Sequence, residues 1–259
     1  MTLQLSTYVE TSLLPVLYKG AVCPAAPTGH VLRLYTTAGT DAAGGTELSG
    51  NGYAPMPLAG LLGTPQVAGE DVAISNIGRI ESAEATGAWP EATHWGVTDG
   101  SGDWLLFGAI TDPQTVAAGE RFVAQIGEFD VSLSGALALT GKTAVLNWLW
   151  HGQAITPATA SQIALYDAAD VEVSTSGTGY SRQAITLGAV TDAGDGSHEI
   201  ANTNAVEVTP SGNWGTVARI GVLAGDGTVL ARGALAAAKS YGTGSIFQLP
   251  AGDLQLALG

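Results

Sequence analysis

One long sequence pattern occurs twice in this chain, and the repeat constrains the fold more than any other feature. Residues 86–97 read TGAWPEATHWGV, and residues 211–222 read SGNWGTVARIGV, 125 residues later. Further matches keep the same order, beginning with LYKGA at residues 17–21 and LWHGQA at residues 149–154. Two copies are too few for a solenoid, but each copy has the length of an ordinary domain. The sequence therefore predicts two tandem units.

Each unit has the pattern of short antiparallel strands. Apolar and polar residues alternate, as at Phe129, Val131 and Leu133, which indicates strands with one buried face. Turn signals rich in Gly and Asp separate such segments. We expect an all-β fold of two tandem antiparallel β-sandwich or jelly-roll-like domains, the first in residues 1–135 and the second in residues 140–259.

One helical segment is expected at the start of each unit. Residues 142–152 place apolar residues such as Val145 and Leu149 on one face, and Gly152 is a typical stop. The corresponding segment, residues 6–20, contains Pro15. Proline inside a helix removes a hydrogen bond, so Pro15 is expected to kink this helix or to end its first half.

Charge and composition exclude several classes of protein. The net charge is −14, from 23 acidic and 9 basic residues, which disfavours direct nucleic-acid binding. The single cysteine, Cys23, excludes an internal disulfide framework and a cysteine-rich zinc site. The chain has no uncharged apolar run long enough for a membrane span, and its N-terminal residues lack the basic region of a signal peptide. We therefore expect no membrane insertion.

The segment ALALTGKT, residues 136–143, resembles the spacing of a phosphate-binding loop followed by a helix. Its interior has no glycine before Gly141, however, so its backbone is poorly suited to wrap a phosphate. The segment also falls where the connection between the two units must lie. We interpret it as that connection plus the start of a helix; a nucleotide hydrolase that uses Lys142 is the alternative.

No catalytic residue, cofactor or metal is predicted. The histidines do not recur between the units and have no ligand-like spacing, so we expect surface or boundary positions, with a metal or acid–base role as the minority alternative. The turn DAGDGSHE has carboxylates that could approach calcium, but its spacing differs from an EF-hand loop. The residues concerned are His30, His94, His151 and His198, and, for calcium, Asp192, Asp195 and Glu199.

The aromatic residues that recur in both copies, such as Trp89 and Trp214, are expected in the core. Tryptophans without an aromatic counterpart are the better candidates for contact with a ligand or partner. Trp104 beside the acidic turn DGSGD is the first choice, because sugar-binding platforms often combine an exposed ring with a nearby carboxylate. We therefore predict Trp104, Trp95 and Asp103 as contact residues.

The second unit resembles a module of tailed-bacteriophage virion proteins of the tail fibre, minor tail or head-decoration type. The resemblance rests on GYSRQAIT at residues 179–186 and PAGDLQLAL at residues 250–258. The first unit departs from it, with GYAPMPLAG at residues 52–60 and no PAGDL turn.

This resemblance implies a non-enzymatic structural protein on the virion surface, made in the host cytoplasm. Its partners would be capsid or tail proteins, and it would form a homo-oligomer, for which a trimer is one form. A fibre adhesin that binds a glycan on the host surface is the alternative function.

Overall fold

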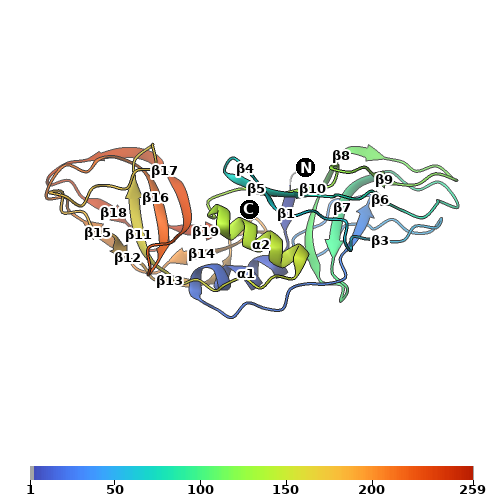
Figure 1. The fold of residues 1–259 in the computed structure, drawn as a ribbon, viewed down its shortest axis with the longest axis horizontal. Coiled ribbons are helices and arrows are strands. Elements are labelled where there is room, and N and C mark those ends of the chain that lie inside the picture. Colours follow the sequence, from blue (N-terminus) through green and yellow to red (C-terminus); the bar gives the residue numbers. More distant parts are fainter. Residues whose placement is uncertain (1–2, 259) are drawn as a thin grey trace.

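The computed structural model describes residues 3–258 and is mainly β, as the sequence predicts. Figure 1 shows an elongated molecule with β structure at both ends and two helices between them. We call residues 3–135 unit one and residues 136–258 unit two.

Unit one contains a five-stranded antiparallel sheet in the order β1-β8-β7-β2-β3. A three-stranded sheet, β10-β5-β4, and the short pair β6-β9 complete it. The strands are β1 (Leu3–Leu5), β2 (Val31–Tyr35), β3 (Met56–Pro57), β4 (Gln66–Ala68), β5 (Asp71–Ser75), β6 (Ile80–Glu81), β7 (Ala92–Thr98), β8 (Trp104–Gln114), β9 (Val123–Ala124) and β10 (Asp130–Leu133).

Unit two repeats this arrangement. Its sheets are β12-β11-β16-β17, β13-β14-β19 and β15-β18, and an isolated bridge between Leu137 and Ala231 takes the place of the β1-β8 pairing. The strands are β11 (Ala160–Tyr166), β12 (Gln183–Ala184), β13 (Leu187–Asp192), β14 (His198–Asn202), β15 (Val206–Val208), β16 (Gly215–Ala224), β17 (Val229–Tyr241), β18 (Phe247–Leu249) and β19 (Gln255–Ala257).

The recurring aromatic residues are structural, which confirms that expectation. In unit one the Trp89 indole N–H donates to Asn51 O, and its ring meets Tyr53 edge-on at 5.3 Å between centroids. In unit two Trp214 meets Tyr180 in the same way, at 5.4 Å. Both tryptophans are buried. Edge-to-face packing adds to the burial of such large rings, so the pair stabilises the same corner in each unit.

The helices α1 (Thr7–Lys19) and α2 (Leu139–His151) each have 13 residues. The Ser6 hydroxyl caps α1 by accepting from Val9 N, and a glycine in the left-handed conformation ends each helix. The helix does not end at Pro15, because α1 continues through it to Lys19, so that alternative is wrong. Apolar residues on both sides of Pro15 are buried, which offsets the lost backbone hydrogen bond. Neither helix, within residues 3–258, is long enough and apolar enough to cross a membrane.

The two units share one hydrophobic core. A single cluster of buried residues includes Leu13 and Leu106 from unit one together with Leu146 and Ile200 from unit two. The division into independent domains at residues 135 and 140 therefore stays a prediction, and unfolding experiments are the way to test it.

Candidate functional site

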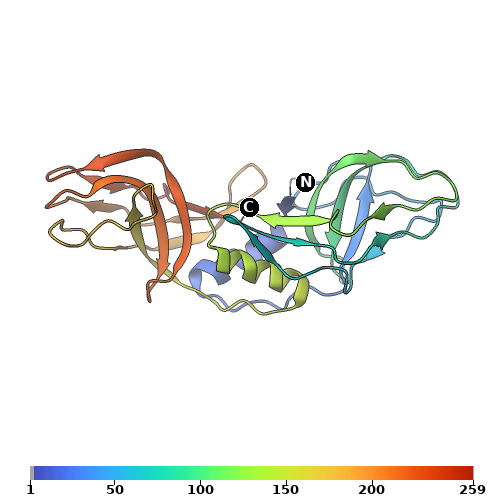
Figure 2. The same cartoon turned by 45° about the horizontal axis from the view of Figure 1, so that its top comes forward.

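Each helix belongs to one unit by sequence and packs on the other unit in space. Helix α1 follows β1 of unit one but contacts β13 and β14 of unit two, and α2 contacts β5 of unit one. Figure 2 shows both helices between the two β ends. We call this arrangement the helix crossing.

Polar side chains occupy matching positions on the two sides of the helix crossing. In α2, the buried Lys142 ammonium donates to the backbone oxygen of Glu70 and lies 3.7 Å from the Asp71 carboxylate. The matching position of α1 is Glu10, whose carboxylate accepts from His198 N at 2.9 Å. Asp71 and His198 each begin the middle strand of a three-stranded sheet. A buried ammonium thus lies on one side of the crossing, and a buried carboxylate lies on the other.

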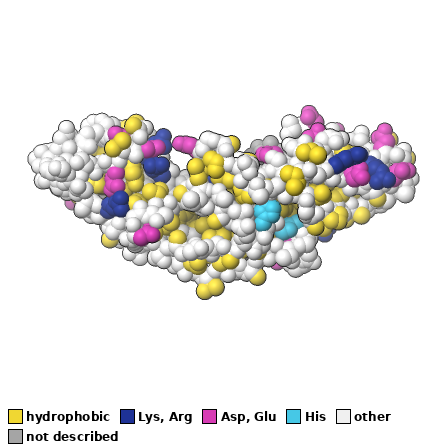
Figure 3. Space-filling model, viewed as in Figure 1, with side chains coloured by type: hydrophobic (Ala, Val, Ile, Leu, Met, Phe, Trp, Pro, Cys, Tyr) yellow, Lys and Arg dark blue, Asp and Glu magenta, His cyan; other side chains and the backbone are white. Residues whose placement is uncertain are grey.

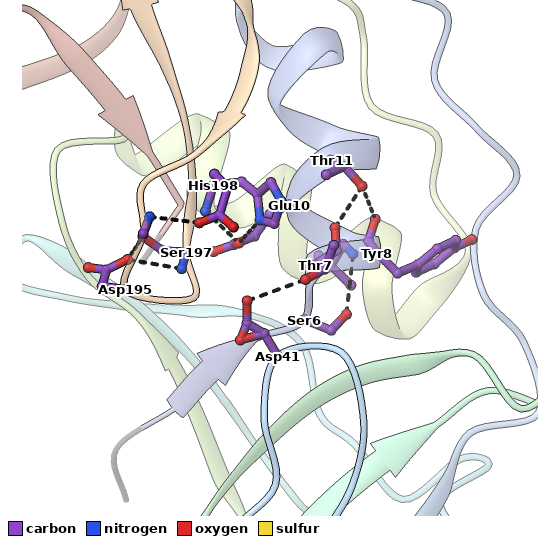
Figure 4. Close-up of polar contacts among 12 residues, drawn as sticks. Ser6, Thr7, Tyr8, Glu10, Thr11, Asp41, Asp195, Ser197 and His198 are labelled. Atoms are coloured by element: carbon purple, nitrogen blue, oxygen red, sulfur yellow. Dashed lines mark hydrogen bonds and ion pairs between the residues drawn. The ribbon is translucent and has the colours of Figure 1, made fainter.

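Glu10 is brought into the interior by the apolar face of α1. It follows Val9 and precedes Leu13 and Leu14 on the buried side of the helix, and only 4% of its side chain is exposed. A carboxylate this deep needs polar neighbours. Figure 4 shows that these come from unit two, through His198, and from the loop that carries Asp41.

The Asp41 loop is an enlargement found in unit one. Eleven residues separate the bridged pair Tyr35 and Glu47, whereas five separate the corresponding pair in unit two, Tyr166 and Glu172. The longer loop reaches the first turn of α1, where Asp41 O accepts from the backbone N–H of the first helical residue at 3.1 Å.

Side chains also fix the Asp41 loop. The Thr7 hydroxyl donates to Asp41 Oδ2 at 3.3 Å, and the Trp104 indole N–H donates to Thr40 O at 3.0 Å. These contacts hold the Asp41 carboxylate beside Glu10.

The turn before β14 places His198. Asp192 Oδ1 accepts from Gly194 N, and Asp195 Oδ1 accepts from both the backbone and the hydroxyl of Ser197. Gly196 has φ +98°, and a Cβ there would lie 3.1 Å from Asp41 Oδ1, so the turn and the Asp41 loop are in close contact. Two of the carboxylates considered for calcium, Asp192 and Asp195, thus shape the turn, and within residues 3–258 they form no three-ligand group with Glu199.

Glu10, Asp41 and His198 form such a group. One ligand atom from each lies within 4.8 Å of the other two. Burial raises the pKa of Glu10 to about 7, although the hydrogen bonds from His198 favour its charged form; the Asp41 charge adds to the increase. The group places two carboxyl groups and an imidazole together, Glu10 buried and the other two half-buried, and these are groups that can bind a cation.

The residues predicted as contacts lie elsewhere. The Trp104 ring is buried against Phe107 and supports the Asp41 loop through its indole N–H. Trp95 is 2% exposed and packs on Phe129. Asp103 is exposed, with its backbone N–H bonded to Asp99 in the acidic turn. Neither ring offers an exposed stacking face in this structure, and contact of these residues with a ligand stays a prediction.

The nucleotide alternative for Lys142 does not fit its surroundings. Its side chain is 2% exposed, and its ammonium is already bonded to unit one. The start of a helix here is confirmed, since α2 begins at Leu139. Residues 136–138 are not a free connection, however, because they pair with β17 of unit two: Ala138 N donates to Leu230 O, and Arg232 N donates to Ala136 O.

A family model described as podophage GP4 fiber I protein gp80 matches this chain twice, over residues 4–132 and residues 136–257. The chain belongs to this fibre family. The resemblance to phage virion modules is thereby confirmed, and the match includes unit one, where the motifs are weakest. No curated protein matches the chain. Fibre family membership makes the chain a structural component of a phage particle.

Proposed function

We propose that the chain is a non-enzymatic building block of a fibre on the outside of the virion, where it makes assembly contacts with other virion proteins and with copies of itself. The observation that carries this proposal is the fibre-family match, which covers both units of the chain. The helix crossing supports it, because it joins both units into one elongated body (Figure 1). A fibre segment needs such a body, since it must hold its length between attachment points.

The surface suggests where contacts form. Figure 3 shows Lys and Arg side chains over the two β ends of this face and largely uncharged surface over the helices. Unit one also exposes Ile77 and Ile126 by 61% and 68%, and Asn76 bonds to the backbone on both sides of Ile126. Unit two has Thr203 and Ala251 at the matching positions. We assign the two isoleucines to a contact with another virion protein, because exposed aliphatic side chains favour protein surfaces.

The test is the location and copy number of the chain in intact particles. Quantitative mass spectrometry of purified virions should find it at a fixed multiple of the portal protein, and gold-labelled antibodies should mark an external fibre. Light scattering of the purified chain should give an oligomer of one defined size. Absence from washed particles, or a label confined to the particle interior, would contradict the proposal.

A further inference from the structure

The group Glu10, Asp41 and His198 is assembled from three separate elements of both units. Glu10 comes from α1, Asp41 from the enlarged loop of unit one, and His198 from the start of β14 in unit two. All three ligand atoms lie within 4.8 Å of one another, although the residues are far apart in sequence. The helix crossing brings His198 to Glu10, and the Asp41 loop brings the third residue to the same helix.

The Glu10 carboxylate has unused capacity to bind a cation. His198 N donates to Oε2 at 2.9 Å, and His198 Nδ1 lies 3.3 Å from the same oxygen, which is long for a hydrogen bond. Among residues 3–258, no hydrogen bond reaches the second oxygen, Oε1. The imidazole is therefore placed beside the carboxylate without being tightly bonded to it, as two ligands of one ion would be.

The other side of the helix crossing supplies an internal comparison. There the matching helix position is Lys142, and its buried ammonium lies among oxygen atoms of Glu70 and Asp71. Around Glu10 the chain instead has two carboxylates and one imidazole, and the second carboxylate comes from a loop extension that unit two lacks. On the α2 side of the crossing, the Lys142 ammonium is itself the cation. On the α1 side, the chain supplies only groups that could bind one.

We propose that Glu10, Asp41 and His198 bind one divalent metal ion of the zinc class, which ties unit one to unit two. Imidazole nitrogen and carboxylate oxygen are common zinc ligands, and three protein ligands leave one position for water. Calcium is disfavoured, because it prefers a set made only of oxygen atoms. Bonds of about 2.1 Å in a tetrahedron place ligand atoms about 3.4 Å apart, and the pair His198 Nδ1 and Glu10 Oε2 already has this spacing, at 3.3 Å.

The experiment uses the full chain, freed of metal with a chelator and titrated with zinc chloride by calorimetry. We expect one zinc ion per chain and a melting temperature that rises with zinc concentration, because the ion binds the folded state. Glu10→Gln, Asp41→Asn and His198→Gln should each weaken zinc binding by about tenfold or more. Asp41→Asn is the decisive variant, since it lies in a loop and leaves the buried face of α1 intact.

The matched control is His151→Gln, which removes an exposed histidine outside the group, and zinc affinity should stay within about twofold of wild type. Circular dichroism in chelator checks that each variant is folded before metal is added. The proposal is overturned if the folded wild-type chain binds no zinc at a free zinc concentration about 100-fold above a Kd of about 1 μM. It is also overturned if Asp41→Asn binds zinc as tightly as wild type, or if His151→Gln alone abolishes binding.

Discussion

Lys142 gives the sharpest test of the helix crossing, because it belongs to unit two and bonds to unit one. Lys142→Ala removes three buried methylene groups, at about 0.8 kcal/mol each, and a charge-assisted hydrogen bond worth about 1.5–3 kcal/mol. The variant also no longer has to remove an ammonium from water on folding, and the absence of this desolvation cost offsets much of the second loss. The free energy of unfolding should therefore fall by about 3 kcal/mol.

Lys142→Met separates packing from charge, because methionine keeps most of the buried stem. The variant should lose only about 1 kcal/mol, so the difference of about 2 kcal/mol between the two variants measures the packing of that stem. Lys239→Ala, an exposed lysine of β17, is the control and should change stability by less than about 1 kcal/mol.

The assay is urea unfolding followed by tryptophan fluorescence and far-ultraviolet circular dichroism. Because the units share one core, both probes should give a single coincident transition, and the Lys142 variants should shift all of it. Two separate transitions, with the Lys142 variants shifting one of them, would refute the shared core and support independent domains. Equal losses for the alanine and methionine variants would refute the packing estimate.

Three other changes test separate features. Replacing Ile77 and Ile126 by the residues that the second copy carries, I77T/I126A, should leave the melting temperature within about 2 °C and reduce incorporation into particles; normal incorporation would argue against that contact. The Arg182 hydrogen bonds hold the pKa of Glu172 below its ordinary value of 4.5, so this pair stabilises the fold above that pH and loses its effect as pH falls through the lower folded-state pKa. Glu172→Gln should cost about 0.2–1 kcal/mol at neutral pH and less in acid, and an equal cost at both pH values would contradict the assignment. Trp104→Phe removes the indole N–H that holds the enlarged loop, so zinc affinity should fall several-fold, by less than on loss of a direct ligand; unchanged affinity would show that the loop needs no such support.

The repeat made much of each unit predictable from sequence. Trp89 and Trp214 keep a fixed offset, and both form the predicted buried corner with a tyrosine. Alternating apolar residues gave the β class, because that pattern reflects one buried face of a strand. The helix end expected at Pro15 was wrong, since the burial of neighbouring side chains depends on contacts with both units that the local sequence does not show.

The candidate site could not be found in the same way. Glu10, Asp41 and His198 have no spacing in common, and the helix crossing that gathers them is a property of the packed chain. One signal was present: Glu10 and Lys142 are matching helix positions that carry opposite charges on buried faces. Charged residues are rarely buried without partners, so two of them in a repeat point to contacts beyond their own unit.

The helix crossing also determines how the molecule responds to a pull along its long axis. Each helix is continuous with one end of the molecule and packed on the other, so separating the ends must slide both helices across their contacts at once. The force is then shared by two packed helix faces and the covalent connection. It does not act on one sheet edge alone, where strands would separate one after another. We therefore expect the chain to resist such a pull through both helix contacts, with the covalent connection near residue 135 carrying only part of the load.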